Sequence, residues 1–286
     1  MNQPATPPVP TRSVLLTDKT GGQIEVLVDD AACDGTEPAA AEGATQATAA
    51  AAIVLLPSSQ RDARDLGPLA AHLGGAGFRV LRPQPRGMGR SSAAPTDLSL
   101  HHLASDVAQA ISTLGGGRAI VAGHAFGHFV ARVTDLDHAA LVRGVVVMAG
   151  AALSFPPGLT QALDLAADAA QPRSARLAAL QQAFFAPGND PTPWLAGWHP
   201  QLREVYRQAS ATPPKAAWWP HSHSPVLDLQ AEGDPWRPSA TRDELRAVLG
   251  DQVSVALIAH ASHALPHEQP AAVAAAITAW ARTLPA

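Results

Sequence analysis

Residues 120–132 are Ile-Val-Ala-Gly-His-Ala-Phe-Gly-His-Phe-Val-Ala-Arg, and the rest of the chain is organised around them. A short apolar strand is predicted at 118–122, followed by a tight turn between Gly123 and Gly127 and then by a helix. Glycines flank such a turn because neighbouring backbone passes too close for a Cβ and because the turn uses unusual dihedral angles. The pattern therefore predicts a strand–turn–helix unit whose middle residue projects above the edge of a sheet.

The spacing of these two glycines matches the Gly-x-Ser-x-Gly motif, in which the serine is a nucleophile held on a strained turn. Ala125 occupies the place of that serine. A methyl group can neither attack a carbonyl carbon nor be activated by a base. Acyl-enzyme chemistry at position 125 is therefore excluded.

The composition indicates a soluble globular protein. The chain of 286 residues carries 20 Lys and Arg against 24 Asp and Glu, a net charge of −4, with no basic block. This balance argues against nucleic acid or an anionic membrane surface as a partner. Cys33 is the only cysteine, so we expect neither an internal disulfide nor a cysteine metal cluster. The sequence leaves a homodimer open.

Two further features bear on the location of the protein and on cofactors. Residues 1–10 lack the charged region and apolar run of a signal peptide, and no apolar run approaches the ~18 residues of a membrane-spanning helix. We therefore expect a cytoplasmic protein. His221 and His223 resemble half of a metal site, but no further ligands are spaced to complete it, so a solvated pair is expected. No metal and no cofactor are predicted.

Short apolar runs alternate with helical patterns along most of the chain. Strands are predicted at 13–16, 23–28, 52–56, 78–81, 118–122, 143–149, 226–230 and 253–258, and the first two form a hairpin. Helices are predicted at 66–73, 100–114, 126–139, 160–170, 174–185 and 270–284, with Ser99 as the N-cap of the second. Thr241 and Glu244 have the spacing of a capping box for one more helix. The alternation predicts an α/β fold with a parallel sheet covered on both faces.

Two segments interrupt the alternation. Residues 31–50 are rich in alanine, threonine and glycine without periodicity, which favours a flexible surface loop, with a helix as the alternative. Residues 151–223 contain no convincing strand and hold most of the aromatic side chains of the chain. Aromatic rings in such an insertion either roof a pocket or hold the insertion against the core.

The turn at 123–127 resembles the nucleophile elbow of the α/β-hydrolase superfamily, and the resemblance extends over residues 53–280. Segments 184–191 and 262–270 are also similar to a mostly bacterial group in which a Gly-His-Ala-Phe-Gly elbow is expected. The resemblance implies the α/β-hydrolase fold, with a mostly parallel central sheet and helices on both faces. It assigns 1–150 and 224–286 to the core and 151–223 to an inserted helical lid.

In this superfamily the chain order of the site is nucleophile, acid, histidine. Position 125, Asp234 and His263 follow that order, each just past a predicted strand, where α/β sheets place their sites. A carboxylate that accepts from one imidazole nitrogen fixes the tautomer and leaves the other nitrogen free as a general base. Weaker candidates are Asp228 and Glu232 for the acid, and His260 and His267 for the base.

The resemblance also implies two backbone donors for an oxyanion, the amides of Ser59 and Phe126. Ser58 stands where the superfamily usually has glycine, so an ordinary strand-to-helix turn is the alternative for this loop. Gln84 stands before an Arg-Gly-x-Gly-x-Ser turn at a position where aspartate is common. The expected lining of the substrate pocket is Ser58, His124, Trp194 and Trp198.

Together these features predict hydrolysis of a small apolar ester or lactone without a serine nucleophile. His263 would be the general base on water and Asp234 would orient it. Three alternatives stay open: a His–Asp lyase or oxygenase, a non-catalytic ligand-binding protein, and a serine-to-alanine variant of an ordinary serine hydrolase.

Overall fold

The computed structural model describes residues 11–19, 21–31, 51–150 and 152–285. The loop predicted at 31–50 therefore lies outside the described residues except for its first residue, Ala31. Cys33 and residues 1–10 also lie outside these ranges.

One 8-stranded sheet forms the centre of the fold, with the strand order β1-β2-β4-β3-β5-β6-β7-β8. Its strands are β1 (Arg12–Thr17), β2 (Gln23–Asp29), β3 (Ala52–Leu56), β4 (Arg79–Pro83), β5 (Ala119–His124), β6 (Val142–Met148), β7 (Val226–Ala231) and β8 (Val253–Ile258). The hairpin of β1 and β2 pairs antiparallel with β4, and the remaining neighbours are parallel. The predicted α/β fold with a mostly parallel sheet is confirmed.

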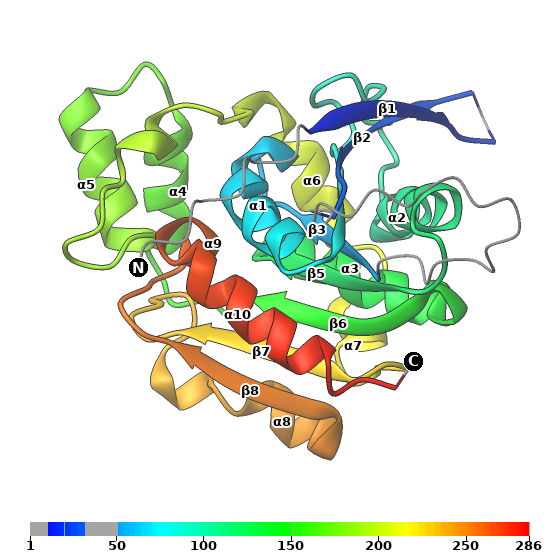
Figure 1. Ribbon diagram of the computed structural model, residues 1–286. Helices are drawn as coiled ribbons and strands as arrows, with labels where there is room; N and C mark the ends of the chain where they lie inside the picture. The colour runs from blue at the N-terminus through cyan, green and yellow to red at the C-terminus, as the bar shows by residue number, and fades with distance from the viewer. Residues whose placement is uncertain (1–10, 20, 32–50, 151, 286) are drawn as a thin grey trace, which may run out of the picture.

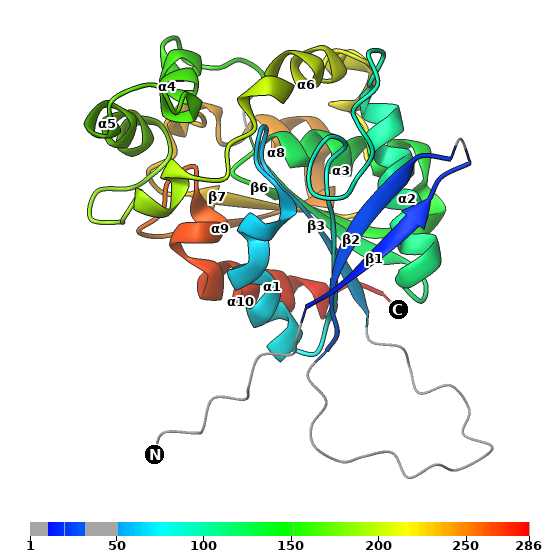
Figure 2. The same cartoon turned by 90° about the horizontal axis from the view of Figure 1, so that it is seen from above.

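The parallel strands are apolar on both faces because helices cover both faces. In β3, Val54 packs into one core and Ile53 and Leu55 pack into the other, as the alternation of side chains along a strand requires. The helices α2 (Leu100–Leu114), α3 (Phe126–Asp137) and α8 (Glu244–Leu249) contribute to the first core. The second core takes side chains from α1 (Gly67–Gly75), α9 (Leu265–Glu268) and α10 (Pro270–Ala281) (Figure 2).

The chain between β6 and β7 forms an inserted segment, which we define as residues 152–223. Its helices are α4 (Leu159–Ala167), α5 (Arg173–Ala183), α6 (Arg203–Ala209) and α7 (Lys215–Trp218). Figure 1 shows α4 and α5 beyond the carboxyl ends of β6 and β7. A separate apolar cluster, which includes Leu180, Phe184 and Trp194, holds this segment together. The inserted segment therefore lies over the edge of the sheet where the predicted site residues follow their strands.

The two predicted helix caps have different outcomes. The Ser99 hydroxyl accepts from the backbone N–H of His102, and His102 Nδ1 accepts from the N–H of Ser99, so α2 begins with a capping box. The capping box predicted for α8 is wrong. The Thr241 hydroxyl donates to the Pro238 carbonyl at 2.9 Å, and the Glu244 carboxylate accepts from the N–H of Leu153 at 2.8 Å.

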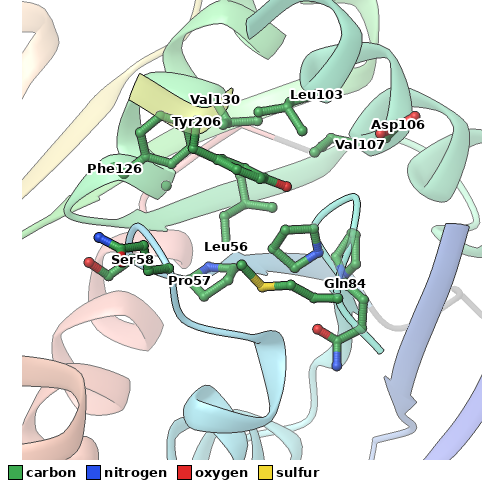
Figure 3. A pocket seen from close by; sticks show the side chains of 15 residues that line it. Leu56, Pro57, Ser58, Gln84, Leu103, Asp106, Val107, Phe126, Val130 and Tyr206 are labelled. Carbon is green, nitrogen blue, oxygen red and sulfur yellow. The ribbon is translucent and has the colours of Figure 1, made fainter. Parts of the chain in front are cut away.

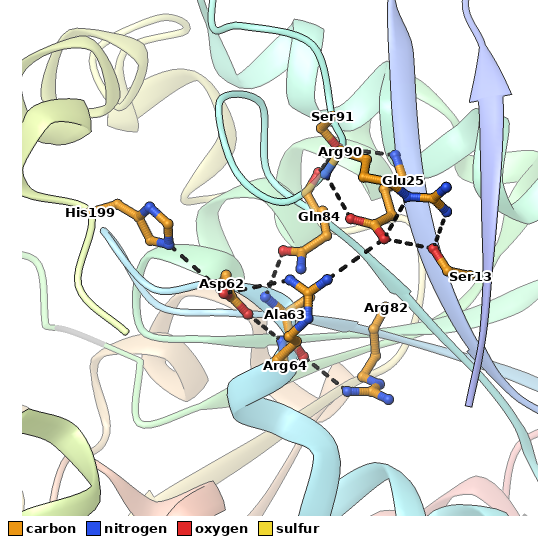
Figure 4. Close-up of polar contacts among 10 residues, drawn as sticks. All are labelled: Ser13, Glu25, Asp62, Ala63, Arg64, Arg82, Gln84, Arg90, Ser91 and His199. Atoms are coloured by element: carbon orange, nitrogen blue, oxygen red, sulfur yellow. Dashed lines mark hydrogen bonds and ion pairs between the residues drawn. The ribbon is translucent and has the colours of Figure 1, made fainter. Parts of the chain in front are cut away.

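A polar cluster ties the edge hairpin to the loops beside the site (Figure 4). The Glu25 carboxylate, 2% exposed, accepts from Ser13 Oγ at 2.6 Å and from the Arg90 N–H at 2.8 Å. Burial alone would raise the pKa of Glu25, but these hydrogen bonds hold it below its usual value. Gln84 Oε1 accepts from the N–H of Ala63 at 3.0 Å, so the glutamine fixes the chain that follows the loop at 58–60.

Candidate active site

The turn between β5 and α3 holds Ala125 in an unusual backbone conformation, with φ 47° and ψ −116°. Both flanking glycines are required by close packing. A Cβ on Gly123 would lie 2.2 Å from the carbonyl of Gly127, and a Cβ on Gly127 would lie 2.5 Å from the Leu56 oxygen. A positive φ is costly for a residue with a side chain and persists only where its surroundings enforce it. The packing of β3, β5 and α3 therefore fixes this turn.

His263 and Asp234 lie together, on the loops that follow β8 and β7. His263 Nδ1 is 3.1 Å from each carboxylate oxygen of Asp234, and both side chains are buried. An ionised carboxylate only accepts hydrogen bonds, so the proton is assigned to Nδ1 and the lone pair to Nε2. The Asp234 carboxylate also accepts from the N–H of Trp236 at 2.9 Å. The pair has the arrangement of a general base and the carboxylate that orients it.

The other acid and base candidates have different partners. Asp228 is fully buried within β7 and forms two hydrogen bonds with Arg237, at 2.6 and 2.7 Å. The Glu232 carboxylate accepts from the backbone N–H of the exposed His260 at 3.1 Å. Among the described residues, Asp234 is thus the only carboxylate that bonds to His263.

Aromatic rings hold the His263 imidazole in place. The ring centroids of Trp236 and Phe184 lie 5.1 and 5.7 Å from that of His263. Trp236 Nε1 donates to the Ala183 carbonyl at 2.7 Å, which fixes the indole. The sequence pattern predicts neither of these contacts with His263, although Phe184 lies in the aromatic-rich insertion. The only sequence signal for Trp236 is its position two residues after the acid.

His124, Trp194 and Trp198, predicted to line the substrate pocket, contact His263 or the buried Arg61. His124 Nε2 donates to the His263 carbonyl at 2.7 Å. Burial, and then the neighbouring His263, hold the pKa of His124 well below its usual value, so the ring is neutral. The rings of Trp194 and Trp198 lie 4.6 and 4.7 Å from the guanidinium carbon of the buried Arg61. His124, Trp194 and Trp198 are not among the residues that line the cavity beside Ala125 and His263.

A cavity of about 340 Å³ opens beside Ala125 and His263. Ser59 and Phe126, the predicted oxyanion donors, line it, and so does Ser58, which was predicted in the substrate pocket. Most of the remaining wall is apolar or aromatic. The other lining residues are Gln60, Phe129, Phe155, Thr160, Leu163, Phe184, Arg203, Tyr206, Arg207, Ser210 and Trp236. The cavity therefore combines polar groups, among them His263 and Ser59, with aromatic rings that suit the apolar part of a ligand.

A smaller cavity of about 40 Å³ lies beside the first (Figure 3). Its walls are mainly apolar and include Leu56, Leu103, Val107 and Val130. Ser58, Gln60, Phe126 and Tyr206 line both cavities. The rings of Phe126 and Tyr206 meet edge to face at 5.6 Å, and the Tyr206 hydroxyl donates to the Arg86 carbonyl at 2.8 Å. This aromatic pair forms part of the wall between the two cavities.

Within the described residues, no group of three or more histidine, cysteine, aspartate or glutamate side chains is placed to hold a metal ion. No helix of the same part of the chain is long and apolar enough to cross a membrane.

Comparisons with known proteins agree with the fold. A family model described as "Alpha/beta hydrolase family" matches residues 53–276. No curated protein sequence matches the chain. A hydrolase from Pseudomonas aeruginosa PA01 superimposes with a TM-score of 0.70 at 19% identity, covering 94% of this chain and 98% of that one.

Two further solved structures are similar in fold. A thermophilic esterase from Thermogutta terrifontis has a TM-score of 0.71 at 20% identity, with 95% of this chain and 98% of that chain covered. The carboxylesterase CesB (YbfK) from Bacillus subtilis has a TM-score of 0.69 at 16% identity, with 96% and 92% covered. At such identities these likenesses concern the fold alone.

Proposed function

The chain belongs to the alpha/beta hydrolase family, and we propose that it hydrolyses an ester of a small, largely apolar compound with water as the nucleophile. The observation that carries the proposal is the buried pair of His263 and Asp234, with His263 and Ala125 on the wall of one cavity. An esterase and a carboxylesterase among the structures of similar fold support an ester as the substrate. In this proposal the inserted segment is the lid over the cavity.

The proposed reaction is a direct hydrolysis. Asp234 accepts from Nδ1 of His263, so Nε2 removes a proton from water as the water oxygen bonds to the carbonyl carbon. The negative charge that develops on the carbonyl oxygen is stabilised by the amides of Ser59 and Phe126. When the tetrahedral intermediate collapses, the bond to the leaving oxygen breaks and His263 returns the proton to it. The products are one acid and one alcohol.

The methyl group of Ala125 sets the scale of the expected rate. Removing the nucleophile of a serine protease costs about 10⁶ in turnover and leaves about 10³ to 10⁴ over the uncatalysed reaction. The loss of about 10⁶ in turnover corresponds to roughly 8 kcal/mol of activation free energy. We therefore expect a slow enzyme whose activity is seen first with activated esters.

The test is steady-state hydrolysis of p-nitrophenyl butyrate by the wild-type protein and by His263→Ala. A positioned general base contributes about 10² to 10⁴, so His263→Ala is expected to lose at least about 100-fold in kcat/KM. His260→Ala is the matched control, because His260 is exposed and binds its neighbours through its backbone. Equal rates for wild type and His263→Ala would contradict the proposal.

Further experiments separate direct hydrolysis from the three alternatives, which are a lyase or oxygenase, a serine-to-alanine variant of a serine hydrolase, and a ligand-binding protein. In ¹⁸O-labelled water the acid product is expected to carry solvent oxygen, whereas a lyase or oxygenase product would not. A serine-to-alanine variant of an ordinary serine hydrolase predicts that Ala125→Ser regains fast esterase activity and reacts covalently with a fluorophosphonate probe, and absence of labelling in the folded variant would count against that alternative. Saturable binding of an apolar ester without any turnover would indicate a ligand-binding protein instead.

A further inference from the structure

The main cavity, the one that Ala125 and His263 line, has an uneven distribution of charge. Apart from His263, its charged lining residues are Arg203 and Arg207, and no aspartate or glutamate is among the lining residues. The chain as a whole carries a net charge of −4, so the positively charged side chains on the wall of this cavity are opposite in sign to the net charge of the protein. A cavity with cations and no carboxylate on its wall favours an anionic group in the ligand.

The two arginines lie on one face of α6. Arg203, Tyr206, Arg207 and Ser210 follow the i, i+3, i+4, i+7 spacing of a helix face, and all four line the main cavity. Tyr206 is buried, and its ring packs against Phe126, beside Ala125. The side chains of Arg203 and Arg207 are 47% and 65% exposed. The face thus leads from the reacting end of the cavity to a cationic rim.

Both guanidinium groups keep donors that the protein does not use. Arg203 donates from Nη2 to Asp164 at 2.7 Å, and Arg207 donates from Nε and Nη2 to Glu204 at 2.8 and 2.6 Å. Within the described residues, Arg203 uses neither Nε nor Nη1 as a donor to a protein acceptor. Arg207 likewise leaves its Nη1 without a protein acceptor there. Guanidinium N–H groups that are not used within the protein can donate to the oxygens of a carboxylate or a phosphate.

We propose that the substrate is an ester that carries an oxyanion group, a carboxylate or a phosphate, bound by Arg203 and Arg207 while the ester lies at His263. The inference rests on the proposed function and names its substrate class. The aromatic wall between the rim and the base, which includes Phe129, Phe155 and Trp236, binds the apolar chain that joins the two groups.

The test is calorimetric titration of three methyl esters of equal chain length, ending in a methyl group, a carboxylate or a phosphate. Titration into His263→Ala protein separates binding from hydrolysis. One of the two anionic esters is expected to bind about fivefold more tightly than the neutral one in 20 mM salt, since exposed ion pairs contribute modestly. Screening is expected to remove most of this preference in 0.5 M salt. The tighter of the two anionic esters identifies the oxyanion.

Variants assign the preference to the arginines. The double variant Arg203→Gln, Arg207→Gln is expected to abolish the preference for the anionic ester over the neutral one. If the double variant does not fold, Arg207→Gln alone serves instead. Its ion-pair partner, Glu204, lies on the same helix. Glu204→Gln is expected to tighten binding of the anionic ester, because it removes the carboxylate that competes for Arg207. Arg246→Gln, an exposed change on α8 outside the main cavity, is the matched control.

The outcomes keep the two proposals apart. A preference for the anionic esters that survives the arginine variants, or no such preference in 20 mM salt, overturns the oxyanion subsite. Hydrolysis of neutral esters without an anionic preference supports the hydrolase and contradicts the subsite. An anionic preference that depends on Arg203 and Arg207, without turnover of any ester by the wild type, supports the subsite and contradicts hydrolysis.

Discussion

At the scale of single residues, three histidines near the site take no part in the proposed chemistry, and of these His124 and His128 are buried and His267 is partly buried. Burial holds the pKa of His124 and of His128 well below the usual value. Burial, and then the charge of Arg61, lower the pKa of His267 to about 3. All three rings are therefore neutral in the folded protein at neutral pH, whereas the unfolded chain protonates its histidines near pH 6.5.

These histidines make stability depend on pH with a definite sign. A base whose folded-state pKa is lowered binds fewer protons in the folded than in the unfolded state, so the free energy of unfolding falls as pH decreases. For His267 the window runs from about 6.5 down to about 3, at up to ~1.4 kcal/mol per pH unit. His267→Phe keeps a ring against Trp194, so it is expected to reduce this slope by about one proton.

Urea unfolding at pH 7, 6 and 5 measures that slope. His72→Asn, an exposed change on α1, is the matched control and is expected to leave it unchanged. The same slope for His267→Phe and wild type would contradict the assignment.

Part of the site could be predicted from the sequence because its residues follow strands. Asp234 and His263 are adjacent in space since β7 and β8 are neighbouring parallel strands, whose carboxyl ends meet at one edge. The contacts of Arg61, Phe184 and Trp236 could not be predicted. They join segments far apart in the chain, and an aromatic residue in an insertion has the same sequence pattern whether it roofs a cavity or packs behind a catalytic histidine.

At the scale of elements, the starts of α2 and α8 show what decides a helix cap. Both sequences place a hydroxyl residue before a helical pattern, but only the Ser99 hydroxyl reaches the helix backbone. Thr241 ends a short 3₁₀ turn and donates back to Pro238. The strands were easier to predict than these caps, because burial on both faces leaves continuous apolar runs such as Ala52–Leu56.

The difference between the caps is measurable. Ser99→Ala is expected to lower the free energy of unfolding by about 1 kcal/mol, because the N–H of His102 in the first turn of α2 loses its acceptor. Thr241→Ala is expected to change it by less than about 0.5 kcal/mol, since its bond lies in an exposed turn. Urea denaturation of the two variants and the wild type makes the comparison. An equal decrease in the free energy of unfolding for both variants would contradict a stabilising role for the cap of α2.

At the scale of the whole molecule, one point of contact joins the inserted segment to the loop that follows β3. The buried Arg61 stacks against Trp194 and Trp198, pairs with Asp65 and donates to the Ala196 carbonyl at 2.7 Å. The N–H of His199 donates to the Gln60 carbonyl at 3.0 Å. The inserted segment and the loop that carries Ser58 and Ser59 are therefore held by the same contacts.

Removal of the Arg61 guanidinium is expected to loosen both segments together. Arg61→Met loses two cation–π contacts and leaves Asp65 without its ion pair. Amide exchange at 194–199 and at 58–61 is expected to accelerate by about tenfold or more, as local opening becomes less costly. Hydrogen exchange read by mass spectrometry checks this, with the half-exposed Arg64→Met as control. Faster exchange in only one of the two segments would contradict a shared attachment.

The turn around Ala125 has a consequence for the history of the protein. Gly123 and Gly127 are fixed by backbone that approaches them from other elements, and neither contact involves the side chain at 125. Alanine and serine codons differ by a single base, so one point mutation in the gene would place a hydroxyl on the wall that His263 shares. A single nucleotide change therefore separates a turn without a nucleophile from one with a serine, and the rest of the turn would need no alteration.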